Sequence, residues 1–263
     1  MVEINKKKIL ITGASDGIGA AVAKTIAANG GVPILVARTE EKLKALQREL
    51  KQLYNVSAYI YVSDISNHES WFATMKQIEA DVLEIDALIN NAGYGLFERF
   101  DQLESDDIKG MVDLNVLGVM YTTKYFLPLL KKKSVSHIIN IASQAGKIQT
   151  PKSAVYSATK SAVIAFTNSL RLELNMENVY VTSVNLGPVG TSFFSIADPE
   201  GTYIKNVKKY MLDPDRVAEK IVQTLFTSKR EINLPNWMQL GSKLYQLCPH
   251  LMETLLRPLF YKK

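Results

Sequence analysis

Short apolar runs alternate with longer stretches of helical periodicity through most of the chain, and this alternation limits the fold more than any other feature. The runs are rich in β-branched residues and bounded by Gly, Asn or Pro, as buried strands are: Lys8–Thr12, Val32–Ala37, Ser57–Val62, Ala87–Asn90, His137–Ala142 and Tyr180–Asn185. The stretches between them are Ile18–Asn29, Glu40–Leu53, Asn67–Ala80 (with Asn67 as its cap), Ser105–Leu130 and Tyr156–Met176. The sequence therefore predicts an α/β fold, a doubly wound parallel sheet in three α/β/α layers.

The regular alternation stops after Asn185. The segment 187–210 mixes Gly, Pro, Ser and aromatic residues, which predicts a loop with short helices, and we expect it to form a substrate lid. Asp213–Thr227 is helical again, with Asp213-Pro214 at its start, and Glu231–Leu234 is a candidate last strand. Because no repeat or linker interrupts the pattern, we expect residues 1–263 to form one domain, with an apolar and basic tail at 236–263.

Composition narrows the classes of function. Hydrophobic residues make up 47% and charged residues 22% of the chain, as in ordinary soluble domains. The net charge of +5 suits an anionic ligand, but it is too small to indicate nucleic-acid binding. The single cysteine, Cys248, excludes an internal disulfide and suits the cytoplasm. His68, His137 and His250 lie far apart, so no metal site is expected, and no apolar run has the length of a membrane span.

A glycine-rich segment, Thr-Gly-Ala-Ser-Asp-Gly-Ile-Gly at 12–19, joins the first expected strand to the first expected helix. A pyrophosphate binds to backbone N–H groups at a helix N-terminus, and glycines let the backbone approach it closely. The alternative is an ordinary glycine-rich turn, but the strand before and the helix after favour a dinucleotide site. The expected contacts in this segment are Gly13, Ser15, Asp16, Gly17, Ile18 and Gly19.

The end of the second expected strand bears on the choice of cofactor. An NAD site needs a carboxylate about 20 residues past the glycines, where it binds the ribose 2′-hydroxyl. Here Ala37 is neutral and Arg38 is cationic, and a guanidinium can pair with a 2′-phosphate. These two residues predict NADP(H) rather than NAD(H). The alternative is that Arg38 is only a surface arginine.

Tyr156 and Lys160 are four residues apart on one helical face, and Ser143 follows the preceding expected strand. When a hydride reaches a carbonyl, the oxygen needs a proton, which a phenol can supply. The reference pKa of tyrosine is about 10, so we expect the positive charge of Lys160 to lower the pKa of Tyr156. The Ser143 hydroxyl can donate a hydrogen bond to the substrate oxygen.

Together these motifs resemble the short-chain dehydrogenase/reductase family, whose members of this length carry Thr-Gly-x-x-x-Gly-x-Gly and Tyr-x-x-x-Lys. The resemblance runs from about Lys7 to Leu234. It implies a Rossmann-type sheet and hydride transfer between NADP(H) and a carbonyl or secondary alcohol. The chain departs from the family pattern at Asp16, where a small hydroxyl residue is frequent, and at Leu186, where proline is usual.

The resemblance also implies roles for individual residues. Ser143, Tyr156 and Lys160 match the catalytic serine, tyrosine and lysine, and Asn115 matches an asparagine that interrupts a helix and positions a water. Tyr156 and Lys160 would in addition contact the cofactor, Lys160 at the nicotinamide ribose. The further cofactor contacts that it implies are Ser15 near the ribose, Asp64 and Ile65 at the adenine, Asn91, Ala92 and Gly93 beside the cofactor, and Val189 and Thr191 at the nicotinamide carboxamide.

Two other functions fit parts of the pattern. A catalytically silent NADP-binding sensor on the same fold is the first, although such a protein would be expected to lose Tyr156 or Lys160. A nucleotide-sugar epimerase or dehydratase is the second, but those relatives carry Gly-x-x-Gly-x-x-Gly, which Asp16 breaks.

The expected substrate walls are Tyr94–Phe100, Gln144–Ser153 and Ser192–Tyr210, which are apolar with few charges. They favour reduction of a hydrophobic ketone or aldehyde as a small-molecule substrate. The expected substrate contacts are Ser143, Tyr94, Ile148, Phe193 and Phe194.

A homodimer or homotetramer is expected by resemblance, through the helices 105–130 and 156–176. Small residues would let helices approach closely; they are Ala158, Ala162, Ala165 and Ser169. The alternative is that these residues face the sheet of their own subunit.

The tail carries a leucine-rich stripe at steps of three and four residues, which Pro249 should break into two short helices. The stripe consists of Trp237, Leu240, Leu244, Leu247, Leu251, Leu255 and Leu259, and its basic neighbours are Lys243, Arg257, Lys262 and Lys263. We expect it to pack on the substrate cleft or on a partner subunit. Peripheral contact with an anionic membrane is the less favoured alternative.

Overall fold

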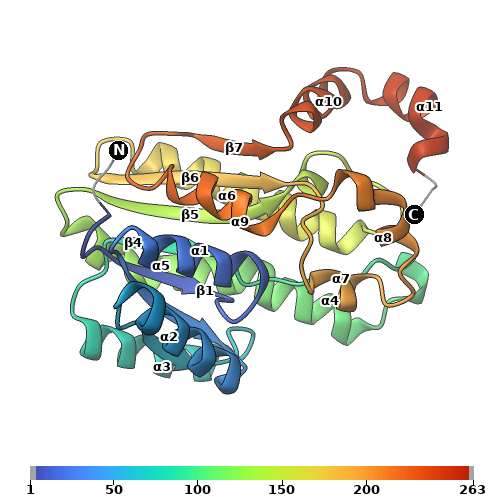
Figure 1. The fold of residues 1–263 in the computed structure, drawn as a ribbon. Coiled ribbons are helices and arrows are strands. Elements are labelled where there is room, and N and C mark those ends of the chain that lie inside the picture. The colour runs from blue at the N-terminus through green and yellow to red at the C-terminus, as the bar shows by residue number, and fades with distance from the viewer. Residues whose placement is uncertain (1–3, 261–263) are drawn as a thin grey trace.

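The computed structural model describes residues 4–260, with side chains as far as Leu255. All seven strands of this part of the chain belong to one parallel sheet in the order β3-β2-β1-β4-β5-β6-β7 (Figure 1). The strands are β1 (Lys8–Thr12), β2 (Val32–Ala37), β3 (Tyr59–Val62), β4 (Ala87–Asn90), β5 (Ser136–Ser143), β6 (Val179–Leu186) and β7 (Glu231–Leu234). The order reverses at β1, which pairs with β2 on one side and β4 on the other. The predicted doubly wound α/β fold is thereby confirmed.

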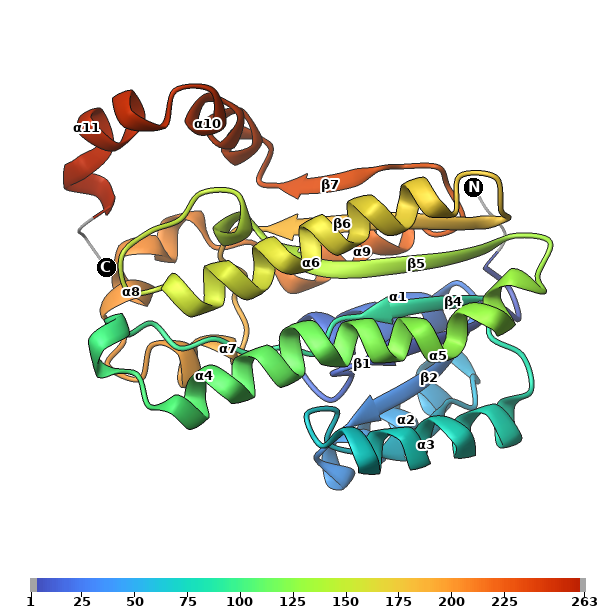
Figure 2. The same cartoon turned by 180° about the vertical axis from the view of Figure 1, so that it is seen from behind.

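Helices cover both faces of the sheet, as predicted (Figure 2). The α-helices are α1 (Gly17–Ala28), α2 (Glu40–Tyr54), α3 (His68–Val82), α4 (Ser105–Val112), α5 (Val119–Lys131), α6 (Ala154–Glu173), α7 (Phe193–Ala197), α8 (Thr202–Val207), α9 (Pro214–Val222), α10 (Asn236–Leu247) and α11 (Pro249–Phe260). Three short 3₁₀ turns are η1 (Phe100–Gln102), η3 (Gln144–Gly146) and η4 (Lys208–Tyr210), and η2 (Asp113–Gly118) is π-helical.

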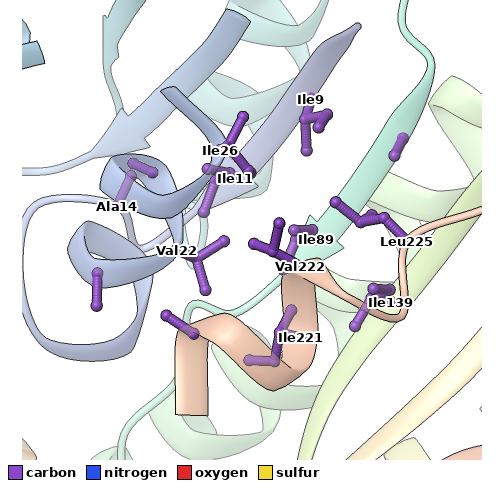
Figure 3. Close-up of a cluster of buried hydrophobic side chains, with 14 of the residues drawn as sticks. Ile9, Ile11, Ala14, Val22, Ile26, Ile89, Ile139, Ile221, Val222 and Leu225 are labelled. Carbon is purple, nitrogen blue, oxygen red and sulfur yellow. The ribbon is translucent and has the colours of Figure 1, made fainter. Parts of the chain in front are cut away.

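Each face of the sheet has its own apolar core. One core joins α1, α2 and α9 to the sheet, and Figure 3 shows Val22 from α1 and Ile221 from α9 in one cluster with the strand residue Ile89. The other joins α3, α5 and α6 around Trp71 and Phe126, which are fully buried. Two buried layers of this kind hold the carboxyl ends of the strands in fixed relation, and ligands bind at that edge in open α/β sheets.

Most element boundaries follow the sequence signals. Asn67 caps α3, its side chain accepting a hydrogen bond from the Ser70 N–H, and Asp213 caps α9 with Pro214 in the first turn. The expected strand 57–62 begins only at Tyr59. The expected helix 213–227 ends at Val222, and turns follow it.

The helix predicted over 105–130 is not continuous. Between α4 and α5 the backbone forms the π-helical turn Asp113–Gly118, which contains Asn115. The Asn115 side chain is held by the main chain of Tyr94 and by the Thr159 hydroxyl, so this turn is fixed from outside the helix. Apolar periodicity runs on through such a turn and cannot reveal it.

The segment 187–210 contains α7, α8 and η4, and the tail forms two helices that meet at Cys248, as predicted. The leucine stripe is nevertheless exposed, so it does not pack on the cleft of its own chain as expected; packing on a partner subunit stays a prediction. Leu259 lies outside the residues whose side chains are described. Along α6, Ala158, Ala165 and Ser169 are exposed, so they do not face the sheet. No helix in residues 4–260 combines the length and apolarity needed to cross a bilayer.

Candidate functional site

The glycine loop forms a cradle at the N-terminus of α1. Gly13 and Gly17 have φ of +65° and +53°, which L side chains rarely adopt. A Cβ on Gly13 would lie 2.8 Å from the Ala92 Cα, and one on Gly19 would collide with the Gly13 carbonyl oxygen. The loop therefore needs glycine for its shape, and its backbone faces the start of a helix. Such a cradle fits the pyrophosphate of a dinucleotide.

Thr12 and Asn91 fasten this loop to the end of β4. The Thr12 hydroxyl accepts hydrogen bonds from the N–H groups of Asn91 and Ala92, both at 3.0 Å. The Asn91 amide donates in return to the carbonyl oxygens of Thr12 and Gly13, both at 3.0 Å. Thr12 opens the glycine-rich motif but was not among the predicted contacts, because the motif does not show which segment its hydroxyl reaches. Its role here is to hold two loops together.

Asp16 caps α1, its carboxylate accepting a hydrogen bond from the Gly17 N–H at 2.6 Å. The second oxygen of the carboxylate lies 2.6 Å from the Lys42 ammonium on α2. The hydrogen bond from Lys42 is the main cause that holds the pKa of Asp16 below its usual value, and Ser192 adds a further bond. Thr191 packs against Gly17, where a Cβ would lie 3.0 Å from its methyl group. Asp16 thus links the glycine loop to α2 and to the segment after β6.

The expected adenosine contacts lie at the ends of β2 and β3. Arg38 is exposed there, and its guanidinium makes no hydrogen bond or ion pair with any other described residue. Asp64 accepts hydrogen bonds from the Ser66 N–H at 3.0 Å and the Ser66 hydroxyl at 2.6 Å. The Ile65 side chain is buried against Gly118 and leaves only its backbone to face a ligand. Val189 is likewise buried and forms a bridge with Leu212.

Ser143, Tyr156 and Lys160 converge at the carboxyl ends of the strands. Tyr156 lies in the first turn of α6 and is hydrogen-bonded to the Ser143 side chain at the end of β5. The Ser143 hydroxyl also donates to the Leu186 carbonyl oxygen at 3.2 Å and accepts from the Ala145 N–H at 3.1 Å. The Lys160 Nζ donates to the Ile141 carbonyl oxygen at 2.9 Å and lies 5.9 Å from the centre of the Tyr156 ring. A phenol, a hydroxyl and an amine therefore share one small volume.

Burial controls the protonation of this group. It raises the pKa of Tyr156 to about 12, partly offset by the Ser143 hydrogen bond, and it lowers the pKa of Lys160 to about 8. The expectation that Lys160 lowers the pKa of Tyr156 is therefore wrong for the protein without cofactor. Low polarity disfavours the charged forms of both groups, the phenolate and the ammonium. The neutral phenol is the form that can donate a proton.

Asn115 and Gly93 lie next to the ammonium end of Lys160. The Asn115 amide donates to the Tyr94 carbonyl oxygen at 2.8 Å and to the Thr159 hydroxyl at 3.0 Å, while its oxygen accepts from the Tyr94 N–H at 3.0 Å. A Cβ on Gly93 would lie 2.9 Å from the Asn115 oxygen and 3.4 Å from the Lys160 Nζ. Only glycine leaves this approach to Lys160 open. Thr159 was missed because its role appears only when α6 meets the π-helical turn.

An aromatic cluster surrounds Tyr156. Its ring centre lies 5.9 Å from that of Phe97 and 5.7 Å from that of Phe193, and Tyr94 packs in the same cluster. Tyr203, which lies in the expected wall Ser192–Tyr210 but was not among the expected contacts, stacks edge-on against Phe97 at 4.9 Å. Two other residues that were predicted to contact the substrate lie outside this layer of rings. Phe194 is buried behind this layer, and Ile148 lies on the turn after Ser143 outside the cluster.

A cavity of about 590 Å³ lies beside the glycine loop, between α1, the start of α9 and the segment after β6. Its lining residues are Asp16, Gly17, Ala20, Ala21, Lys24, Gly190, Thr191, Ser192, Phe194, Ile204, Met211, Pro214 and Asp215. Tyr156 is not among them. This cavity therefore flanks the cradle and is distinct from the space around the phenol, where the aromatic rings pack.

Comparison with known proteins assigns the family. The family model for short chain dehydrogenases matches residues 7–200. An uncharacterized oxidoreductase of Staphylococcus aureus is 32% identical over 234 residues, which cover 89% of this chain and 96% of that protein. A counterpart from Staphylococcus epidermidis is 33% identical over the same share of each chain.

Solved structures agree with this assignment. An alcohol dehydrogenase from Thermococcus sibiricus, complexed with 5-hydroxy-NADP, is 29% identical with a TM-score of 0.78, over 87% of this chain and 95% of its own. A serine dehydrogenase complexed with NADP+ is 31% identical with a TM-score of 0.75, over 86% and 94%. A relative from Burkholderia phymatum in complex with NAD, at 21% identity and a TM-score of 0.85 over 96% and 97%, shares the fold. The chain belongs to the short-chain dehydrogenase/reductase family.

Proposed function

We propose that this protein is an NADP(H)-dependent oxidoreductase that reduces an apolar ketone or aldehyde in the cytoplasm. The observation that carries the proposal is the convergence of Ser143, Tyr156, Lys160 and Asn115 beside a glycine cradle at a helix N-terminus. When bound, the nicotinamide would supply the hydride. The residues of the chain position the carbonyl and provide the proton.

Each side chain has a distinct task in this proposal. The Tyr156 hydroxyl donates its proton to the carbonyl oxygen as negative charge develops there. The Ser143 hydroxyl, already hydrogen-bonded to Tyr156, turns its proton to the same oxygen and stabilises that charge. Lys160 in its protonated form offsets the charge left on the phenolate, and Asn115 keeps the neighbouring backbone in place.

Support for NADP(H) comes from the end of β2. Arg38 is exposed and unpaired among the described residues, and Ala37 leaves no carboxylate to receive a ribose 2′-hydroxyl. The alcohol dehydrogenase and the serine dehydrogenase named above were both solved with NADP or a derivative. The Burkholderia relative holds NAD but is too distant in sequence to bear on the choice.

Support for an apolar substrate comes from the cluster of Tyr94, Phe97 and Phe193 around the phenol. Such a wall desolvates a bound carbonyl, which strengthens hydrogen bonds to its oxygen. A silent sensor on the same fold would need none of this chemistry, yet all four predicted catalytic positions are filled, and Ser143 and Lys160 both adjoin Tyr156.

The test is NADPH consumption over a panel of ketones, aldehydes and acyl-thioester ketones, with the Tyr156→Phe variant alongside. We expect turnover on one apolar class, and a loss of at least about a thousandfold in kcat for the variant, whose NADPH affinity stays near normal. Lys160→Ala should impair both turnover and NADPH binding. A Tyr156→Phe enzyme with a near-normal rate would reject the mechanism.

A further inference from the structure

Helix α10 carries its apolar face toward solvent. Trp237, Leu240, Leu244 and Leu247 follow each other at steps of three and four residues, so they share one side of the helix. These side chains are 48–78% exposed, whereas Ser242 on the other side is 2% exposed. Amphipathic helices of globular proteins normally point the other way, with leucines inward and serines outward. The inversion indicates that an apolar medium or surface covers this side.

The exposed face extends into α11. Leu251 and Leu255 are 56% and 65% exposed and continue the stripe past Cys248. The two helices are tied by a hydrogen bond of 2.8 Å from the Tyr245 hydroxyl to the Glu253 carboxylate. Figure 1 and Figure 2 both show them projecting from the β7 edge of the sheet, away from the two cores. We call these six residues, Trp237, Leu240, Leu244, Leu247, Leu251 and Leu255, the tail stripe.

The surroundings of the tail stripe are positively charged. Lys205, Lys208 and Lys209 on α8 and η4 are exposed, as is Lys243 on α10 itself. No acidic residue occurs between Gly201 and Leu212 or between Asn236 and Cys248. Glu253 is the acidic residue within α11, and it is engaged by Tyr245. The stripe is thus an apolar surface with a cationic margin.

An aromatic pair joins the stripe to this margin. The rings of Trp237 and Tyr210 are 5.8 Å apart, and the Lys209 ammonium lies 4.8 Å above the Tyr210 ring. Tryptophan and tyrosine are the residues that prefer the boundary between hydrocarbon and water, and lysines beside them bind anionic headgroups. The order of apolar, aromatic and cationic groups across the surface therefore matches a lipid interface.

We propose that the tail stripe docks on an anionic lipid surface, with α10 lying in its plane and the α8–η4 lysines on the headgroups. A second copy of this chain is the competing occupant. A two-fold contact through the stripe would bring the lysines of both copies together, and like charges oppose such a contact. An anionic bilayer can bury the leucines among its acyl chains and attract the lysines to its headgroups.

The test is flotation of the full-length protein with vesicles of phosphatidylcholine alone and of equal parts phosphatidylcholine and phosphatidylglycerol. We expect flotation with the anionic vesicles, little with the neutral ones, and release at high salt, which screens the lysines. Replacing both Lys208 and Lys209 by Glu should weaken binding at least about tenfold, because each lysine near an anionic surface contributes roughly fivefold. Lys51→Glu, at an exposed position on α2, is the control for a charge reversal away from the stripe and should float normally.

The stripe itself is tested by the pair Leu244→Glu and Leu247→Glu. Both side chains are exposed, so the fold and thermal stability should not change, and vesicle binding should be lost. The control is the pair Leu53→Glu and Leu83→Glu, which are also exposed, at 60% and 73%, but lie at the C-terminal ends of α2 and α3.

Three results would overturn the proposal. The first is no flotation of the wild type, and the second is flotation of the stripe variant equal to that of the wild type. The third concerns the oligomeric state. If the wild type sediments as an oligomer without vesicles and the stripe variant as a smaller species, the face joins copies of the chain.

Discussion

The ammonium of Lys42 lies 2.6 Å from the carboxylate of Asp16, across the gap between α2 and the glycine loop. Asp16 stands at a position where this family often has a small hydroxyl residue, and it is the one acidic side chain in the cradle. An unpaired carboxylate would oppose the binding of an anionic pyrophosphate. The pairing removes most of this repulsion and leaves Asp16 free to cap α1.

Lys42→Ala should therefore weaken NADPH binding by about 1.4- to 5-fold, the range that corresponds to an exposed ion pair of roughly 0.2–1 kcal/mol. The loss should disappear when Asp16 is also replaced by Ser, because no charge then needs neutralising. Fluorescence titration of the four proteins gives the double-mutant cycle, with Lys44→Ala on the same helix as control. If Lys42→Ala costs as much in the Asp16→Ser background, Lys42 acts on the ligand directly and the compensation argument fails.

Arg38→Leu tests the choice of cofactor. If the guanidinium pairs with the 2′-phosphate, its removal should cost about 2–3 kcal/mol of NADPH binding and far less of NADH binding. The measurement is the dissociation constants of NADPH and NADH for the wild type and for Arg38→Leu. An equal loss for both cofactors, or none for either, would contradict the NADP(H) assignment.

Much of this site was predictable, because each expected residue stands at a strand end or helix start whose type the sequence signals. The ends of β1, β2 and β4 follow directly from β-branched runs and the turn residues after them. The contacts of Thr12, Thr159 and Tyr203 could not be found in this way, since each residue acts on a segment distant in sequence. The interruption of the helix at Asn115 was expected only from the family resemblance, because side-chain periodicity does not change at the π-helical turn.

The pKa shifts of Tyr156 and Lys160 were also misjudged from the sequence. A pattern of residues shows which charges are neighbours, but desolvation depends on how completely the fold covers them. Burial dominates here and moves the pKa of each group toward its neutral form. The outward face of the tail stripe was missed similarly, because periodicity locates an apolar face without showing what lies opposite it.

Replacing Lys160 by Met should stabilise the cofactor-free protein at pH 7. The pKa of Lys160 falls from 10.5 to about 8 on folding, so folding disfavours the charged form of this side chain by about 3 kcal/mol. The Met variant avoids this cost but loses the hydrogen bond to the Ile141 carbonyl oxygen, which offsets about 1 kcal/mol of the gain. Between about pH 8 and 10.5 the unfolded chain binds the proton and the folded one does not, so this penalty on the wild type shrinks as pH rises.

The measurement is urea unfolding of wild type and Lys160→Met from pH 7 to pH 9, below the range in which Tyr156 ionises on unfolding. The advantage of the variant should be largest at pH 7 and should decline above pH 8. Lys124→Met, at an exposed position on α5, serves as control and should show no such trend. A variant that is less stable than the wild type at pH 7 would mean that the ammonium is better solvated or paired than its burial implies.

The exposed small residues of α6 bear on oligomerisation. Ala158, Ala165 and Ser169 follow each other at steps of seven and four residues on the solvent side of a 20-residue helix, where a neighbouring helix could approach closely. We predict a homodimer or homotetramer at micromolar concentration, packed through α6 and α5. Ala165→Arg should shift it toward monomer, because a long charged side chain would have to be buried between helices. Ala45→Arg, equally exposed on α2, should not. Sedimentation velocity measures both, and a wild type that sediments only as monomer would refute the assembly whatever the variants do.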